Sequence, residues 1–156
     1  MPGAPWTRQK RKPLTVNPVK TRSFALDGSQ GCTDRRPVKN MGKGLFLKTR
    51  ACALQKGDLL EPKVDTYPLI NLKTAEECLE PLWYIEFGKL AIVLRSSHVH
   101  KTTVYHINSS AGDIKPNVEY KYNAFDNKFY LTVLKAIKPG SQLLVRYDPA
   151  NDYFDF

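Results

Sequence analysis

Residues 105–110 read Tyr-His-Ile-Asn-Ser-Ser, and residues 116–118 read Pro-Asn-Val. An aromatic and β-branched run here meets a cluster of side-chain amides and hydroxyls. A buried polar group that is left without a partner costs about 1–3 kcal/mol. Asn108 and Asn117 are therefore predicted either to contact a ligand or to form a knot of internal hydrogen bonds.

Length and composition predict one folded domain that is built mainly from β-strands. A chain of 156 residues buries about two-thirds of its unfolded surface. Eleven prolines and nine glycines, with few long helical patterns, favour strands and loops. No apolar run approaches the ~20 residues of a membrane helix, and the N-terminus lacks the apolar core of a secretory signal. We therefore expect an intracellular protein, nuclear or cytoplasmic, without a membrane partner.

Cysteine and histidine spacing does not predict a metal site. The chain has three cysteines, Cys32, Cys52 and Cys78, and no Cys-x-x-Cys pair. A structural zinc site or a disulfide framework is therefore not expected. The histidines are His98, His100 and His106. A His-x-His pair can place two rings on one face of a strand, but partly exposed polar residues near a loop are the favoured interpretation.

The positive charge is concentrated in the first third of the chain. Residues 1–50 hold twelve Lys and Arg against two Asp, a net charge of +10, whereas the remaining 106 residues sum to −1. Residues 1–39 are basic, rich in proline and poor in apolar side chains, so they are predicted to form an unstructured arm. Within this arm, residues 8–12 could be a nuclear localisation signal or a nucleic-acid contact, and a solvated tail is an equal alternative.

Short strands are predicted for most of residues 40–148, and residues 149–156 form an acidic, aromatic tail. The strand patterns cover residues 84–87, 90–94, 118–122, 129–137 and 142–147. Thr74 and Glu77 form a capping-box pattern that predicts the start of one short helix. Trp83, Tyr84 and Phe87 are expected to be core residues.

Three motifs occur in a fixed order along the predicted domain. They are Gly-Lys-Gly-Leu-Phe at residues 42–46, Ile-Asn-Ser-Ser at residues 107–110 with Pro-Asn-Val at 116–118, and Lys-Pro-Gly-Ser-Gln-Leu-Leu-Val-Arg-Tyr-Asp at 138–148. Together they resemble the SET domain family of protein-lysine methyltransferases over about residues 40–148. The resemblance implies a mainly β, SET-like fold of several small sheets with one or two short helices and a C-terminal pseudoknot.

The resemblance also implies a cofactor site and a catalytic residue. S-adenosylmethionine is the expected cofactor, and the residues expected to bind it are Gly42, Lys43, Gly44, Asn108 and Ser109. Tyr147 falls on the catalytic tyrosine of the family pattern. Tyr105, Tyr153 and Phe154 are expected to line the substrate channel, where aromatic rings suit a lysine ammonium group through cation–π contact. No metal is expected.

The implied substrate is a protein with a target lysine, such as a histone or another basic protein. The alternative is a catalytically inactive SET-like interaction module that its basic arm tethers to chromatin or nucleic acid. Ser109, at the family's histidine position, and Arg146, at its usual aspartate position, motivate this alternative.

Overall fold

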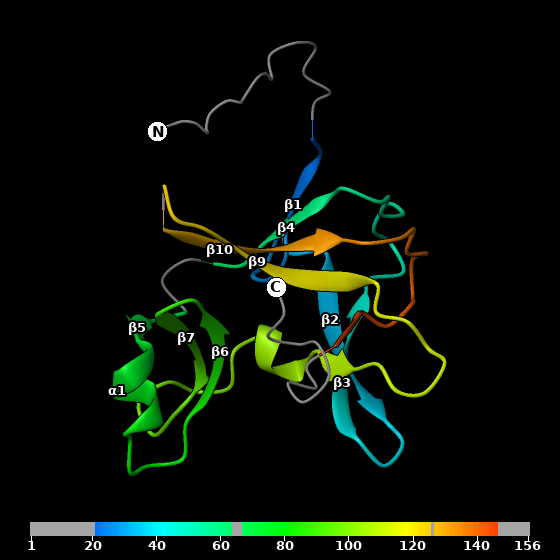
Figure 1. The fold of residues 1–156 in the computed structure, drawn as a ribbon. Coiled ribbons are helices and arrows are strands. Elements are labelled where there is room, and N and C mark those ends of the chain that lie inside the picture. The colour runs from blue at the N-terminus through cyan, green and yellow to red at the C-terminus, as the bar shows by residue number, and fades with distance from the viewer. Residues whose placement is uncertain (1–20, 64–66, 126, 147–156) are drawn as a thin grey trace.

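The computed structural model describes residues 21–63, 67–125 and 127–146. These residues form several small β-sheets with little helix (Figure 1), so the predicted class, mainly β, is confirmed. No helix among the described residues is long and apolar enough to cross a membrane.

The largest sheet has four strands and covers one side of the core. Its strands follow the order β1 (Ser23–Ala25), β4 (Leu59–Glu61), β10 (Lys128–Val133) and β9 (Val118–Asn123). Leu131 on β10 is in register with both Leu60 and Tyr120, and all three side chains are buried. The strict alternation at residues 118–122 therefore predicted this strand and its buried face correctly.

A second sheet of three strands carries the α-helix. It consists of β5 (Leu69–Asn71), β7 (Leu90–Arg95) and β6 (Trp83–Phe87), in that order, and α1 (Leu72–Glu76) follows β5 directly. Residues 91–94 of β7 are all buried, as the apolar run predicts.

The helix start differs from the prediction. Asn71, not Thr74, is the N-cap residue, and its side chain makes no capping hydrogen bond. Strand pairing fixes this start, because Asn71 is in register with Leu90 and the Leu72 N–H donates to the Lys89 carbonyl. Tertiary contacts thus override the local capping pattern.

Regular structure begins well before residue 40, which corrects the predicted extent of the arm. Strand β1 and strand β2 (Thr33–Val38) lie within residues 21–39, and β2 pairs with β3 (Gly42–Leu47) in an antiparallel hairpin. Leu26 between them is fully buried. The composition of residues 21–39 did not predict these strands. One buried leucine and two strand pairings, β1 with β4 and β2 with β3, are enough to order the segment.

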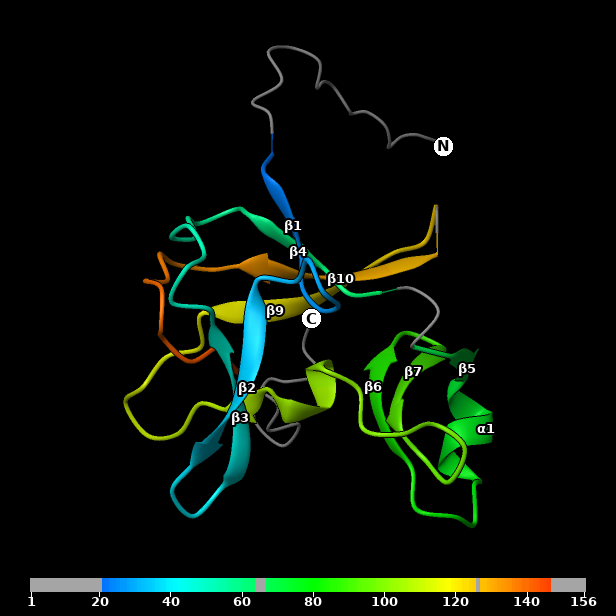
Figure 2. The same cartoon turned by 180° about the vertical axis from the view of Figure 1, so that it is seen from behind.

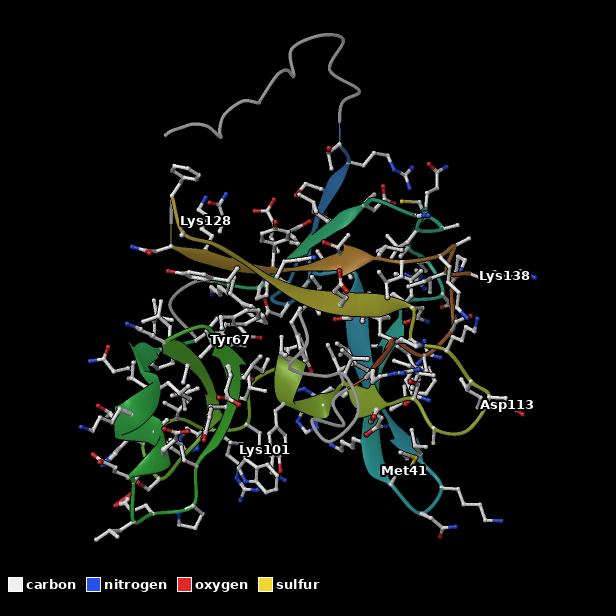
Figure 3. The ribbon with its side chains drawn as sticks, viewed as in Figure 1. Met41, Tyr67, Lys101, Asp113, Lys128 and Lys138 are labelled. Carbon is white, nitrogen blue, oxygen red and sulfur yellow. The ribbon has the colours of Figure 1, made fainter. Side chains whose placement is uncertain are left out.

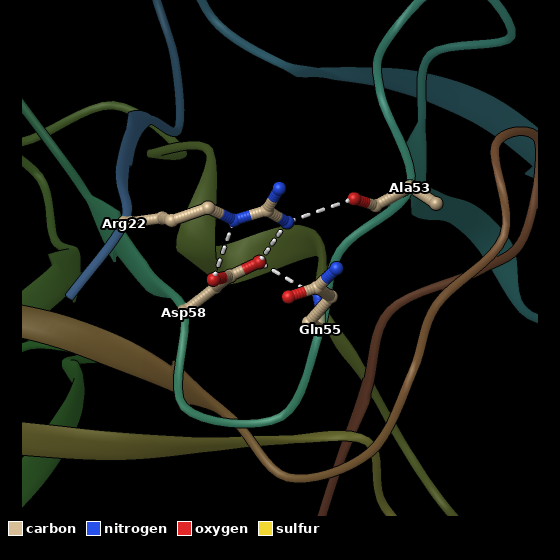
Figure 4. Close-up of polar contacts among 4 residues, drawn as sticks. All are labelled: Arg22, Ala53, Gln55 and Asp58. Atoms are coloured by element: carbon tan, nitrogen blue, oxygen red, sulfur yellow. Dashed lines mark hydrogen bonds and ion pairs between the residues drawn. The ribbon is translucent and has the colours of Figure 1, made fainter. Parts of the chain in front are cut away.

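An ion pair attaches β1 to the turn before β4 (Figure 4). The Arg22 guanidinium donates to both carboxylate oxygens of Asp58, at 3.0 and 2.6 Å, and Nη2 also donates to the Ala53 carbonyl. Asp58 accepts a third hydrogen bond from the Gln55 N–H at 2.7 Å. The hydrogen bonds from Arg22 are the main reason that the pKa of this buried carboxyl is lowered.

The end of the described chain returns to residues 108–117. Strand β11 (Leu144–Val145) lies parallel to β8 (Asn108–Ser109), so two of the described residues of the predicted final strand pair with β8, and Gln142 forms a separate bridge with Phe46. The Asn117 side chain donates to the Gln142 carbonyl at 3.0 Å and accepts from the Leu144 N–H at 2.8 Å. Asn117 is therefore part of a knot of internal hydrogen bonds, one of the two roles predicted for it.

The sheets are arranged around the short 3-10 helix Val104–His106 (η2). Both views show the three-stranded sheet with α1 on one side of this helix and the β2–β3 hairpin on the other (Figures 1 and 2). The four-stranded sheet lies across the end of both units.

Candidate functional site

A cavity of about 780 Å³ lies where η2, the β2–β3 hairpin and the three-stranded sheet meet. Its lining residues are Arg35, Met41, Gly42, Lys43, Trp83, Tyr84, Ile85, Leu94, Lys101, Val104, Tyr105, His106, Ile107, Asn108 and Tyr120. Met41, on the hairpin, and Lys101, on the loop after β7, are labelled in Figure 3 and belong to two different walls. A cavity of this volume can hold a cofactor-sized ligand.

The glycines of β3 form one wall. Gly42 has a φ of +72°, a conformation that favours glycine, and it follows the turn of the hairpin. Gly44 is packed too closely for any side chain, because a Cβ atom there would lie 2.8 Å from Val38 Cγ2 and 3.0 Å from Asn108 Nδ2. The absence of a side chain at Gly44 therefore allows β3 to lie against Asn108.

Asn108 links this wall to the last described strand. Its Nδ2 donates to Gln142 Oε1 at 2.8 Å, and its side chain is nearly buried while still lining the cavity. Ser109 is paired with Val145 and its hydroxyl donates to the Ser110 carbonyl. Ser109 does not belong to the cavity wall as the structure has it.

Tyr67 holds the helix η2 in place under the cavity. Its hydroxyl accepts a hydrogen bond from the Val104 N–H and donates one to Asp27 Oδ2, each at 3.2 Å. Burial is the main cause that raises the pKa of Tyr67, so this hydroxyl keeps its proton. Tyr67 therefore fixes the backbone of Val104, the first residue of η2, and all three residues of this helix line the cavity.

Aromatic rings and cations cover the opposite wall. Trp83 and Tyr105 meet edge to face with ring centroids 5.9 Å apart, and Trp83 is 54% exposed. The Arg95 guanidinium and the Lys101 ammonium lie over the Tyr105 ring at 5.6 and 5.7 Å. Such stacks of rings and cations are worth about 0.5–1 kcal/mol at exposed sites.

His106 lies between these walls with an unsatisfied ring nitrogen. Nε2 is buried and has no hydrogen-bond partner in the structure. Burial, and then the charges of Arg35, Lys101 and Lys43, lower the pKa of His106 to about 4. The imidazole is therefore neutral at physiological pH and can accept or donate a hydrogen bond to a ligand.

The structure brings together four of the residues predicted for the site. Gly42, Lys43 and Asn108, predicted for the cofactor, and Tyr105, predicted for the substrate channel, all line this cavity. Gly44 lies directly behind it against Asn108. The predicted catalytic Tyr147 and the channel residues Tyr153 and Phe154 lie outside the described residues.

Eleven of the fifteen lining residues were not predicted for the site, among them Arg35, Trp83, Tyr84, Lys101 and His106. Arg35 was placed in an unstructured arm, and Trp83 was expected in the core but is more than half exposed. In β2, alternation puts Arg35 on the same face as the β3 residues Leu45 and Lys43, and this alternation is the signal that could have found it.

The lining residues offer aromatic rings, cationic side chains and backbone groups, which can bind a ligand and hold it in position. Over residues 21–63, 67–125 and 127–146, no group of three or more His, Cys, Asp or Glu could hold a metal ion. A comparison with protein-family models finds no match, and a search of curated proteins finds none either.

Proposed function

We propose that the chain is an S-adenosylmethionine-dependent protein-lysine N-methyltransferase with a SET-like fold and a C-terminal pseudoknot. One observation carries the proposal. Segments about sixty residues apart, at residues 42–43 and 105–108, line a single cavity, and residues of both were assigned to one site from sequence. The contact of residues 142–145 with residues 108–117 supports the proposed pseudoknot.

The described residues leave room for the cofactor and offer groups for its carboxylate and its nucleoside. The cavity has room for it, the bare backbone at Gly44 brings β3 against Asn108, and the neutral His106 ring lines the cavity. Lys43 and Arg35 would hold its carboxylate, and Asn108 and the aromatic wall its nucleoside. When bound, the cofactor supplies an electrophilic methyl group on a sulfonium.

The protein's own contribution would be positioning. A lysine amine needs only to be neutral and in line with the methyl group, so orientation and a suitable electrostatic environment can supply most of the rate enhancement. Tyr147 is the residue proposed to orient the amine through its hydroxyl. The aromatic ring of Tyr105 would line the path of the lysine side chain.

Calorimetry of the full chain with S-adenosylmethionine tests the proposal. We expect binding that is weakened in Trp83→Ala, which removes a ring of the wall proposed for the nucleoside, and kept in Tyr130→Ala, because Tyr130 lies on β10 and does not line this cavity. With core histones as the probe, Tyr147→Phe should lower methyl transfer and leave cofactor binding in place. A parent protein that does not bind the cofactor would refute the proposal.

A second candidate, a non-catalytic module that binds nucleic acid, rests on the exposed cations of the hairpin. Arg35, Lys39 and Lys43 are exposed and extend the charge of the N-terminal segment. Deletion of residues 1–20, which spares β1 and β2, should remove salt-dependent DNA binding if those residues supply the contacts. DNA binding of unchanged affinity after this deletion would show that residues 1–20 do not supply the contacts.

A further inference from the structure

The described wall of the cavity carries cations and no anions. Arg35 comes from β2, Lys43 from β3 and Lys101 from the loop after β7, and the lining residues include no Asp or Glu. Arg95 adds a fourth cation over the outer face of Tyr105. Side chains from three separate elements therefore create a positive potential in one cavity, where low-dielectric walls strengthen it.

The lowered pKa of His106, which lines the cavity, is consistent with this positive potential. The charged groups that act on it are Arg35, Lys101 and Lys43, all of one sign, and its other close neighbour is the Tyr105 ring, edge-on at 5.4 Å. Nothing in the described structure satisfies Nε2 or neutralises these charges. A ligand with concentrated negative charge would neutralise these charges.

The wall next to these cations is aromatic. The Tyr105 ring has Trp83 at its edge, and Trp83 is 54% exposed, so an incoming planar ring can reach it. Stacking on an aromatic side chain is a common way in which proteins hold a nucleic acid base, because every base has a π-face. The cavity therefore combines a surface for a planar ring with a surface for an anion.

We infer that this cavity binds a nucleoside monophosphate, with the phosphate held by Arg35, Lys43 and Lys101 beside His106, and the base against Trp83 and Tyr105. A phosphate monoester carries about −1.5 to −2 charges at pH 7. It therefore matches the cations better than the carboxylate of S-adenosylmethionine, whose sulfonium and ammonium groups add positive charge. The nucleotide would compete with that cofactor, but its binding does not depend on methyl transfer.

The first test is calorimetry of the full chain with AMP, adenosine and inorganic phosphate at low ionic strength. AMP should bind at least about tenfold more tightly than adenosine, since charge-assisted hydrogen bonds to the phosphate supply the difference. Inorganic phosphate should bind more weakly than AMP because it lacks the base. Equal affinity for AMP and adenosine would overturn the inference.

Two variants of neighbouring arginines on β2, Arg35→Gln and Arg36→Gln, test where the phosphate binds. Arg35→Gln should weaken AMP binding about tenfold, as should Lys101→Gln, with little change for adenosine. Arg36→Gln is the control, because Arg36 lies on the other face of β2 over the Phe46 ring and is paired with Asp34. An equal loss in Arg36→Gln and Arg35→Gln would mean that general surface charge, not this cavity, attracts the nucleotide.

Proton nuclear magnetic resonance of the His106 ring gives an independent readout. A bound dianion next to the imidazole favours its charged form, so AMP should raise the pKa of His106 from about 4, whereas adenosine should not. The His106→Asn spectrum identifies the signal among the three histidines. An unchanged His106 pKa with AMP bound would overturn the inference.

The two proposals can fail separately. AMP binding without S-adenosylmethionine binding would keep the nucleotide site and refute the methyltransferase. Binding of S-adenosylmethionine without AMP would overturn the nucleotide inference and leave the methyltransferase intact.

Discussion

The two halves of residues 105–118 use their polar groups in opposite ways. Asn117, in the second half, pairs its amide with both the Leu144 N–H and the Gln142 carbonyl. In the first half, the buried Nε2 of His106 has no hydrogen-bond partner, and the residue itself lines the cavity. Asn108 lies at the boundary, because it bonds Gln142 and also lines the cavity.

This contrast separates a structural site from a binding site within one segment. Buried polar groups in folded proteins are nearly always hydrogen-bonded, so saturated groups such as those of Asn117 contribute to stability. An unsatisfied buried nitrogen costs free energy, and a ligand that pairs with it recovers that cost. Substitutions on the Asn117 side should therefore change stability, and substitutions on the cavity side should change binding.

Asn117→Ala should have the largest effect on stability. It leaves the half-buried Leu144 N–H and Gln142 carbonyl without the partner that they have in the parent, so we expect the free energy of unfolding to fall by about 3 kcal/mol. Urea denaturation measures this change. Asn123→Ala is the control, because that side chain accepts one hydrogen bond in an exposed turn, and a loss of similar size there would remove the distinction.

Gly44→Ala should have the next largest effect. The new methyl group would collide with the Val38 side chain and with the Asn108–Gln142 pair, and overpacking of this kind costs about 1–3 kcal/mol. In a Gln142→Ala background one of the colliding groups is gone, so the penalty should be smaller. Penalties that simply add in the double mutant would show that Gly44 does not contact this pair.

A second saturated cluster, Arg22 with Asp58, should make a smaller and pH-dependent contribution. Asp58→Asn weakens the pairing with a half-exposed guanidinium, so we expect a loss of about 1 kcal/mol at pH 7. The pKa of Asp58 is lowered in the folded protein, so its contribution is complete above the unfolded pKa of about 4 and disappears as pH falls through the folded value.

Denaturation of the parent and Asp58→Asn from pH 7 to pH 2 checks this dependence. The two unfolding free energies should converge at the acid end. A gap of constant size across this range would show that the carboxylate charge is not responsible for the stabilisation.

Trp83→Ala should change stability least. The ring is more than half exposed and touches Tyr105 at one edge, so the loss should stay below about 1 kcal/mol. Ligand affinity should nevertheless fall, and ligand binding to the parent should change the fluorescence of Trp83. A stability loss as large as that of Asn117→Ala would place Trp83 with the structural residues.

Local patterns in the sequence predicted the strands of the two main sheets well. The alternation at residues 118–122 and the hairpin at 84–94 depend on neighbouring residues, and both were correct. The helix start at Leu72 and the strands within residues 21–39 were missed. The helix start and β1 depend on pairing with strands distant in the sequence, which a local pattern does not encode. Strand β2 pairs with its neighbour β3, but its charged, proline-containing sequence carries no strand pattern.

The site was partly predictable for the same reason. Gly42, Lys43 and Asn108 could be assigned to one site from the order of the motifs, because each motif is a short stretch that can be found in the sequence by itself. Arg35 and Lys101 looked like ordinary exposed charges, and only the fold brings them to the same cavity as His106. The charge of the cavity is thus a tertiary property that no single stretch of the sequence displays.

The pairing of β11 with β8 also has a consequence for the order of folding. Leu144 is in register with Asn108, so a long stretch of chain must be closed into a loop before this parallel pair can form. Antiparallel neighbours such as β9 and β10 need only a short turn. We expect the amide of Leu144 to become protected from hydrogen exchange later than that of Leu131 in a pulse-labelled refolding experiment. One wall of the cavity would then be completed only after the sheets around it have formed.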